Sequence, residues 1–237
     1  MRIQKLDEGT KKNLLEDLLK RSPNQYPEYE ARVAEILDVV KKEGDKAIFR
    51  FTKQFDGVEV SADTIQVTDE EIREAYEKVD ASLIEIIRKA KKNIEVYHEK
   101  QRQYSWFDSK PNGTMLGQKV TALQRVGVYV PGGKAVYPSS VLMNIIPAKV
   151  AGVEEIVMTT PPGKDGKVNP NTLVAAKEAG ADVIYKVGGA QAIAALAYGT
   201  ESIKKVSLQL SFTTFVYSGV GNSFAPSTSI NSANSPS

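Results

Sequence analysis

The sequence of 237 residues contains no cysteine and a single histidine, His98. The absence of cysteine excludes disulfides, thiolate zinc sites and cysteine nucleophiles, and it is compatible with a reducing cytosol. Metal sites and general acid–base catalysis depend on histidine more than on any other side chain. One histidine therefore leaves this chain with little of either chemistry.

Strong net charge and long apolar runs are also missing. The 31 basic and 29 acidic residues leave a net charge of +2, which supplies no field for binding nucleic acid or an anionic membrane. The longest apolar region, 141–158, is interrupted by polar residues and proline, so it does not predict a membrane span. The charged residues 1–19 lack the apolar core of a signal peptide. We therefore expect a soluble cytoplasmic protein whose partner is a small molecule or another subunit.

Residues 1–114 predict a helical N-terminal region. Apolar residues at helical spacing, together with capping residues and prolines, indicate where the helices begin and end. The predicted helices cover 1–24, 27–43, 45–55, 69–79 and 81–102, with Asp45 and Thr68 as caps.

Three unusual side chains lie near the end of this region. His98 falls on the last predicted helix among charged neighbours, and we expect an exposed or edge histidine without a chemical role. Trp106 and Phe107 fall in a turn-rich connection, where packing is favoured over stacking against a ligand.

From Met115 the chain alternates between strand and helix patterns. Strands are predicted over 120–130, 156–159 and 183–187, and helices over 139–151, 171–179 and 190–198. This alternation is typical of α/β proteins, so residues 115–206 predict a Rossmann-like domain with a parallel sheet and flanking helices. Open sheets of this class bind small molecules at the carboxyl ends of their strands, and we expect the functional site there.

Two glycine motifs follow predicted strands, but neither is a standard nucleotide-binding motif. A P-loop would need glycine and Ser or Thr where the chain has Val128 and Ala135 around the VPGGKA segment. The glycines before Ala190 lack the spacing of the G-x-G-x-x-G fingerprint. A P-loop phosphotransferase is therefore disfavoured, and a dinucleotide would be held in a non-standard way.

Tyr129 and Gln191 are the candidate ligand contacts beside these glycines. Tyr129 precedes a tight Pro-Gly-Gly turn and offers a ring and a hydroxyl, although a strand residue packed against a helix explains it equally well. Gln191 lies in the first turn of a predicted helix, where an amide either faces a ligand or caps the helix.

The two blocks RVGVYVPGGKAVYPSSVLMNIIPAKVAGVEEIVMTTPP and KVGGAQAIAALAYGTESIKKV resemble histidinol dehydrogenase, over residues 1 to about 206. The resemblance implies NAD-dependent oxidation of L-histidinol through an aldehyde to L-histidine, the end of histidine biosynthesis. It also implies a zinc ion that places the substrate and a homodimer with shared active sites. Tyr129 and Gln191 match the family's cofactor residues, whereas no residue of this chain matches a catalytic or metal-binding position.

Residues 207–237 depart from the family pattern. They contain nine serines and no Asp, Glu, Lys or Arg, where the family continues with a GPGN segment and then a second half that carries the zinc ligands and the catalytic glutamate and histidine. We expect either a frameshift or misjoined gene, or a natural disordered Ser/Asn-rich tail.

The sequence thus predicts the NAD-side part of a histidinol dehydrogenase, inactive alone. A nucleotide-binding or interaction module without enzymatic activity is the alternative.

Overall fold

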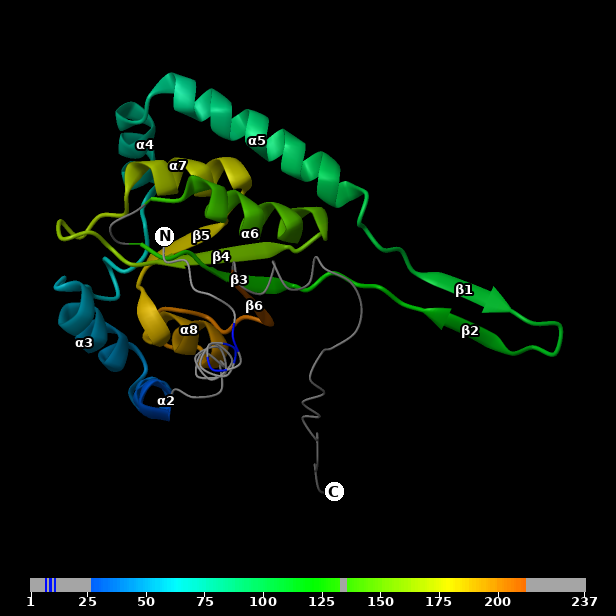
Figure 1. Ribbon diagram of the computed structural model, residues 1–237, viewed down its shortest axis with the longest axis horizontal. Coiled ribbons are helices and arrows are strands. Elements are labelled where there is room, and N and C mark those ends of the chain that lie inside the picture. Colours follow the sequence, from blue (N-terminus) through cyan, green and yellow to red (C-terminus); the bar gives the residue numbers. More distant parts are fainter. Residues whose placement is uncertain (1–6, 8, 10, 12–26, 133–135, 212–237) are drawn as a thin grey trace.

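The computed structural model describes residues 7, 9, 11, 27–132 and 136–211 of the chain (Figure 1). Its centre is a parallel sheet with the strand order β5-β4-β3-β6. These strands are β3 (Arg125–Tyr129), β4 (Glu155–Thr160), β5 (Val183–Lys186) and β6 (Leu208–Ser211). The predicted fold class, a parallel sheet with flanking helices after a helical N-terminal region, is confirmed.

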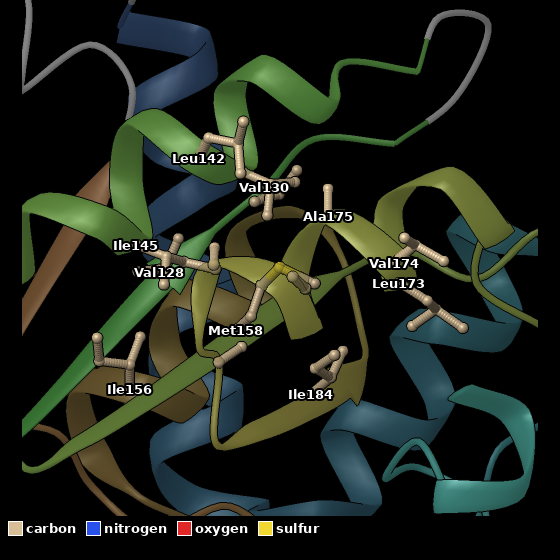
Figure 2. Close-up of a cluster of buried hydrophobic side chains, with 14 of the residues drawn as sticks. Val128, Val130, Leu142, Ile145, Ile156, Met158, Leu173, Val174, Ala175 and Ile184 are labelled. Carbon is tan, nitrogen blue, oxygen red and sulfur yellow. The ribbon is translucent and has the colours of Figure 1, made fainter. Parts of the chain in front are cut away.

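One face of the sheet is covered by two successive layers of helices. The inner layer consists of α6 (Pro138–Val150) and α7 (Pro170–Ala179), and the outer layer of α4 (Asp69–Lys78) and α5 (Ala81–Glu99) (Figure 1). Alternate strand residues point to this face because side chains of a strand alternate between its two sides. Figure 2 shows Val128, Met158 and Ile184 of three neighbouring strands packed against Ile145 and Leu173 of the inner helices.

The other face is covered by α8 (Gly189–Tyr198), which packs against α2 (Pro27–Glu43) and α3 (Asp45–Asp56). Val157 of β4 and Leu196 of α8 belong to this second apolar cluster together with Ile48 of α3. The helical N-terminal region therefore contributes to both faces of the sheet. Among the helices that the described part of the chain forms, none is long and apolar enough to cross a bilayer.

The beginning of α3 differs from its prediction. Gly44, not Asp45, occupies the N-cap position, and it makes no side-chain cap. The Asp45 carboxylate instead accepts a hydrogen bond from the Ser202 backbone N–H at 3.2 Å, while the Asp45 N–H donates to Glu201 at 2.9 Å. A distant segment thus supplies the contacts that a local cap was expected to make. At α4, by contrast, the predicted N-cap Thr68 is present, and it forms a capping box with Glu71.

The turn-rich connection after α5 forms an antiparallel hairpin of β1 (Trp106–Ser109) and β2 (Met115–Gln118), which projects from the body of the molecule (Figure 1). Trp106 and Phe107 are 56% and 62% exposed, so neither packs into the core, although the Phe107 ring lies against Gly117 of the opposite strand. The strand predicted from residue 120 begins only at Arg125. This residue forms the first pair with β4, opposite Glu155.

The sheet continues past residue 206, where the predicted domain ends. Strand β6 pairs in parallel with β3, with Val126 opposite Leu208 and Tyr129 opposite Ser211. The first part of the segment predicted as a tail is therefore an edge strand of the sheet. Residues 212–237, and nearly all of the helix predicted over 1–24, lie outside the described residues.

Candidate functional site

The segments that follow β3, β4 and β5 meet at one proline, Pro161, at the carboxyl edge of the sheet. A Cβ atom added to Gly132, after β3, would lie 2.6 Å from Pro161 Cγ. A Cβ added to Gly188, after β5, would lie 2.6 Å from Pro161 Cβ. Only glycine allows both segments to approach the proline this closely. The two glycine motifs of the sequence are therefore neighbours in space.

Tyr129, the last residue of β3, reaches across to the beginning of α8. The backbone N–H of Gly189 donates to the Tyr129 hydroxyl at 3.3 Å. Gly189 has φ +65°, a left-handed conformation that costs a residue with a side chain about 1–2 kcal/mol. The first turn of α8 has no side-chain cap at Gly188, so the tyrosine hydroxyl is the side-chain partner that the structure provides there.

Gln191 lies two residues further along this turn and is only 1% exposed. Its amide rests against Gly189, because a Cβ on that glycine would lie 2.6 Å from Gln191 Oε1. Neither Oε1 nor Nε2 has a hydrogen-bond partner within the described chain. Leaving a buried polar group unsatisfied costs about 1–3 kcal/mol, so this amide is suited to a ligand that both donates and accepts hydrogen bonds.

The sequence prediction did not include Thr159, which neighbours Tyr129 in the sheet register. Thr159 is fully buried, and its hydroxyl has no hydrogen-bond partner in the described structure. Its backbone carbonyl accepts from the Val130 N–H at 2.9 Å. Two threonines at the end of an apolar strand were the available signal, since polar residues at the carboxyl end of a strand face the ligand side of such sheets.

The sequence predicted Tyr129 and Gln191 as ligand contacts. The structure places both side chains beside Gly189, at the start of α8. The predicted Pro-Gly-Gly turn falls only partly in the described chain, which omits residues 133–135.

A cavity of about 610 Å³ opens beside this turn, on the side of α7. Pro131, Gly132 and Pro161 line it, whereas Tyr129 and Gln191 do not, so the cavity adjoins the candidate contacts without containing them. Asp56 at the end of α3 also lines the cavity, and burial raises the pKa of its carboxyl group. Its Oδ2 atom has no hydrogen-bond partner in the described chain.

A buried ion pair holds the end of β5. Lys186 Nζ lies 2.9 Å from Glu71 Oε1 and 3.1 Å from Oε2, and both side chains are at most 15% exposed. Glu71 also accepts from the Thr68 N–H at 2.9 Å within the capping box. Because buried charges are tolerated only when paired, this contact fixes α4 against the strand that leads into Gly188 and Gln191.

The described residues offer no fitting site for zinc. They bring together no group of three His, Asp or Glu side chains that can hold a metal ion. His98 was expected to be an exposed or edge histidine; it is only 7% exposed, which rules out the exposed alternative, and its Nδ1 lies 2.8 Å from Gln101 Oε1. It lines a second cavity near Val126 and Val153, at the opposite edge of the sheet from Gln191.

Comparison with known proteins gives a consistent result. The family model for histidinol dehydrogenase matches residues 19–221. The histidinol dehydrogenase of Bacillus subtilis is 58% identical over 189 residues, which cover 79% of this chain and 44% of that protein. The Methanocaldococcus jannaschii histidinol dehydrogenase is 52% identical over 209 residues, covering 88% of this chain and 48% of that protein.

A solved structure shares the fold as well as the sequence. The crystal structure of histidinol dehydrogenase from Elizabethkingia anophelis aligns with a TM-score of 0.74 at 35% identity, covering 80% of this chain and 43% of that chain. The chain spans less than half the length of the curated relatives that it matches. The family match also extends to residue 221, beyond residue 206 where the sequence resemblance was expected to end, and it includes β6.

Proposed function

Because the chain belongs to the histidinol dehydrogenase family, we propose that the carboxyl edge of its sheet binds NAD, with Tyr129 and Gln191 as contacts. The observation that carries this proposal is the Gln191 amide, which is 1% exposed and unsatisfied at both polar atoms in the described structure. NAD has amide, hydroxyl and phosphate groups that can donate and accept hydrogen bonds. Binding it would remove the cost of leaving this amide unpaired.

Tyr129 is suited to the same ligand. Its hydroxyl already accepts from the Gly189 N–H and can still donate one hydrogen bond, and the side chain is partly buried at the end of β3. The Gly188 and Gly189 turn leads into the start of α8, where the helix dipole favours negative charge. Thr159 offers a further buried hydroxyl at this edge.

In the complete reaction we propose, NAD accepts hydride during the two successive oxidations that convert L-histidinol to L-histidine in histidine biosynthesis. Zinc and a homodimer belong to this proposal for the full-length family. The described residues lack a zinc-binding group, so no step of the reaction is assigned to them. We expect the 237-residue chain to bind NAD without oxidising L-histidinol.

Calorimetric titration with NAD tests the binding site. Tyr129→Phe removes a hydroxyl and Gln191→Ala removes the buried amide, and each is expected to weaken NAD binding by about 5–10-fold, the value of one hydrogen bond. Tyr76→Phe and Gln118→Ala are the matched controls, because Tyr76 bonds to Glu178 in the outer helical layer and Gln118 lies on the hairpin. Equal affinity of all four variants would remove Tyr129 and Gln191 from the site.

Steady-state assays with L-histidinol, NAD and zinc test the second part of the proposal. Production of NADH by the purified chain should not exceed that of a buffer control. Turnover above this control would show that the chain contains a catalytic centre that the described residues do not reveal.

A further inference from the structure

The turn at the tip of the β1–β2 hairpin contains an Asn-Gly pair, Asn112 and Gly113 (Figure 1). Among the asparagines of the sequence, Asn112 is the only one that precedes a glycine. Because glycine has no Cβ atom, the peptide nitrogen of Gly113 is not shielded by a side chain of its own residue. This nitrogen and the Asn112 amide carbon are therefore suited to react with each other.

The turn leaves this pair open to solvent. The Lys110 N–H donates to the Thr114 carbonyl at 2.8 Å, and the Gly113 N–H donates to the Lys110 carbonyl at 3.0 Å. Gly113 adopts φ +84°, and no atom lies within 4 Å of a Cβ added to it. Residues 110–114 are all exposed, so no part of the described chain packs over the tip. Water can reach the pair, and a small leaving group can depart from it.

A hydrogen bond folds the Asn112 side chain back toward the main chain. The Thr114 N–H donates to Asn112 Oδ1 at 3.0 Å, which is the contact of an Asx turn. The same bond polarises the side-chain carbonyl. It would also stabilise the negative charge that Oδ1 acquires when a nucleophile adds to Cγ, as the donors of an oxyanion hole do.

We propose that Asn112 is a site of spontaneous deamidation, at which the protein converts itself slowly to an aspartate and an isoaspartate form. The Gly113 nitrogen gives its proton to solvent and bonds to Asn112 Cγ, and the Cγ–Nδ2 bond then breaks to release ammonia. One water molecule opens the resulting cyclic imide. Attack of water at Cγ gives aspartate, and attack at the main-chain carbonyl carbon gives isoaspartate. One water is consumed for each ammonia released, and no oxidant or reductant takes part.

One contact of the turn opposes this reaction. The Gly113 N–H must leave the Lys110 carbonyl before its nitrogen can attack. A neutral backbone hydrogen bond makes only a small net contribution to stability, and the tip buries no side chain that opening would expose. Breaking this bond should therefore slow the reaction by no more than about 10-fold.

The other asparagines in the described part of the chain lack this combination. Asn93 and Asn171 lie within helices and precede β-branched residues, which shield the next peptide nitrogen. Asn144 is fully buried and donates to the Ser140 carbonyl at 2.7 Å. Asn169 precedes a proline, which has no N–H to lose. Sequence and structure thus select the same single position.

The two products should differ in their effect on the hairpin. An aspartate at position 112 can keep the hydrogen bond from Thr114, because a carboxylate accepts as the amide oxygen does. Isoaspartate instead carries the main chain through Cγ, which adds one atom to the turn between the paired residues Ser109 and Met115. Since the turn sets the register of a hairpin, the isoaspartate form should pair its strands less well.

Peptide mapping of the purified 237-residue chain, kept warm at neutral pH for increasing times, tests the proposal. Trypsin releases Asn112 within residues 103–119, because it does not cleave before Pro111. The mass of this peptide should rise by about 1 Da as an acid replaces the amide, and chromatography should resolve two products. An isoaspartyl methyltransferase should label one of them.

The same digest contains its own control, residues 93–100, in which Asn93 should keep its amide. A 103–119 peptide of constant mass, or an equal gain in both peptides, would overturn the proposal.

Asn112→Gln is the matched variant, because it keeps the amide but requires attack to close a larger ring. The mass gain of the 103–119 peptide should become at least about 10-fold slower. A gain that continues at the original rate would place the reaction at Gln103 or Gln118 and contradict the assignment.

A synthetic peptide of residues 103–119 separates the effect of the turn from that of the Asn-Gly pair. The folded chain should deamidate within about 10-fold of the rate of the peptide, since one exposed hydrogen bond must open. A rate more than about 100-fold lower in the folded chain would show that the site is covered, and the proposal would fail.

Hydrogen exchange tests the effect on the hairpin. Amides of β1 and β2 should exchange faster in the isoaspartate form than in the Asn112→Asp protein, which carries the same added charge without the extra main-chain atom. Equal exchange in the two proteins would contradict the expected change of register.

Discussion

Gly189 determines how Tyr129 and Gln191 are placed. A side chain at this position is disfavoured twice, by the left-handed backbone and by contact with Gln191 Oε1. We expect Gly189→Ala to lower the free energy of unfolding by about 2–3 kcal/mol and to displace the Gln191 amide, which weakens NAD binding. Urea denaturation and calorimetric titration measure the two effects.

Gly57→Ala is the matched control for this substitution. Gly57 has φ +73° at the C-cap of α3, and no atom lies within 4 Å of an added Cβ. Backbone strain alone should cost about 1 kcal/mol, and NAD affinity should not change. A Gly189→Ala protein that loses no more stability than Gly57→Ala would show that the crowding of Gln191 is unimportant.

Single residues of the candidate site were predictable where local sequence carried the signal. Tyr129 and Gln191 each border glycines at a strand–helix turn, and their proximity follows from the parallel strand order. Pro161 was not predictable as the common contact of Gly132 and Gly188, because that contact depends on packing between three loops. The burial of His98 was missed for a similar reason. Its charged neighbours in the sequence suggest an exposed position, whereas its burial depends on residues that are distant in the sequence and close in space.

At the scale of elements, three helices are joined through the Glu178 carboxylate of α7. It accepts from Arg88 Nη2 of α5 at 2.7 Å and from the Tyr76 hydroxyl of α4 at 3.0 Å. The hydrogen bonds from Arg88 hold the pKa of Glu178 below its usual 4.5, although burial opposes them. Burial raises the pKa of Tyr76 to about 12, with a further contribution from Glu178.

The depressed pKa of Glu178 predicts a pH-dependent stability. Its contribution is present above about pH 4.5, the unfolded value, and is lost as the pH falls through the lower folded pKa. Glu178→Gln should therefore cost about 1–2 kcal/mol at pH 7, and this difference from the unmodified protein should shrink as the pH falls below 4.5. Urea denaturation at a series of pH values measures it.

Glu35→Gln, on the exposed surface of α2, is the control for this series. It should have little effect at either end of the pH range. A constant difference between Glu178→Gln and the unmodified protein from pH 7 to below the folded pKa would show that the ionised carboxylate does not link the helices.

The hairpin shows why a strand pattern can escape detection. Sequence analysis searches for alternating apolar and polar residues, but β1 begins with adjacent Trp106 and Phe107, and β2 with adjacent Met115 and Leu116. Such pairs place one apolar side chain on each face. The Pro111–Gly113 segment was recognisable as a turn, whereas the two flanking strands were not, because neither buries a face in the chain itself.

For the whole molecule, the boundary predicted at residue 206 does not coincide with the end of the sheet. Composition changes sharply there, yet the sheet continues through β6 because backbone pairing with β3 does not require a particular side chain. We expect Gln209→Pro to destabilise the protein by about 3 kcal/mol, since proline removes an N–H from a strand and constrains its backbone. Thermal unfolding measures the loss.

Gln209→Ala separates the backbone effect from the side-chain effect and should be nearly neutral. If Gln209→Pro and Gln209→Ala unfold at the same temperature, residues 208–211 do not belong to the sheet, and the boundary predicted from composition is the correct one.

The contacts of Asp45 with Glu201 and Ser202 have a consequence for synthesis of the protein. The two segments are separated by 156 and 157 positions in the chain. At about 5–20 residues per second, the ribosome needs roughly 10–30 s to deliver Ser202 after Asp45. During this interval α2 and α3 have emerged but their partner α8 is incomplete, so the nascent helices expose the apolar side that later packs against α8. Chaperones that bind apolar segments would find their target in this early part of the chain.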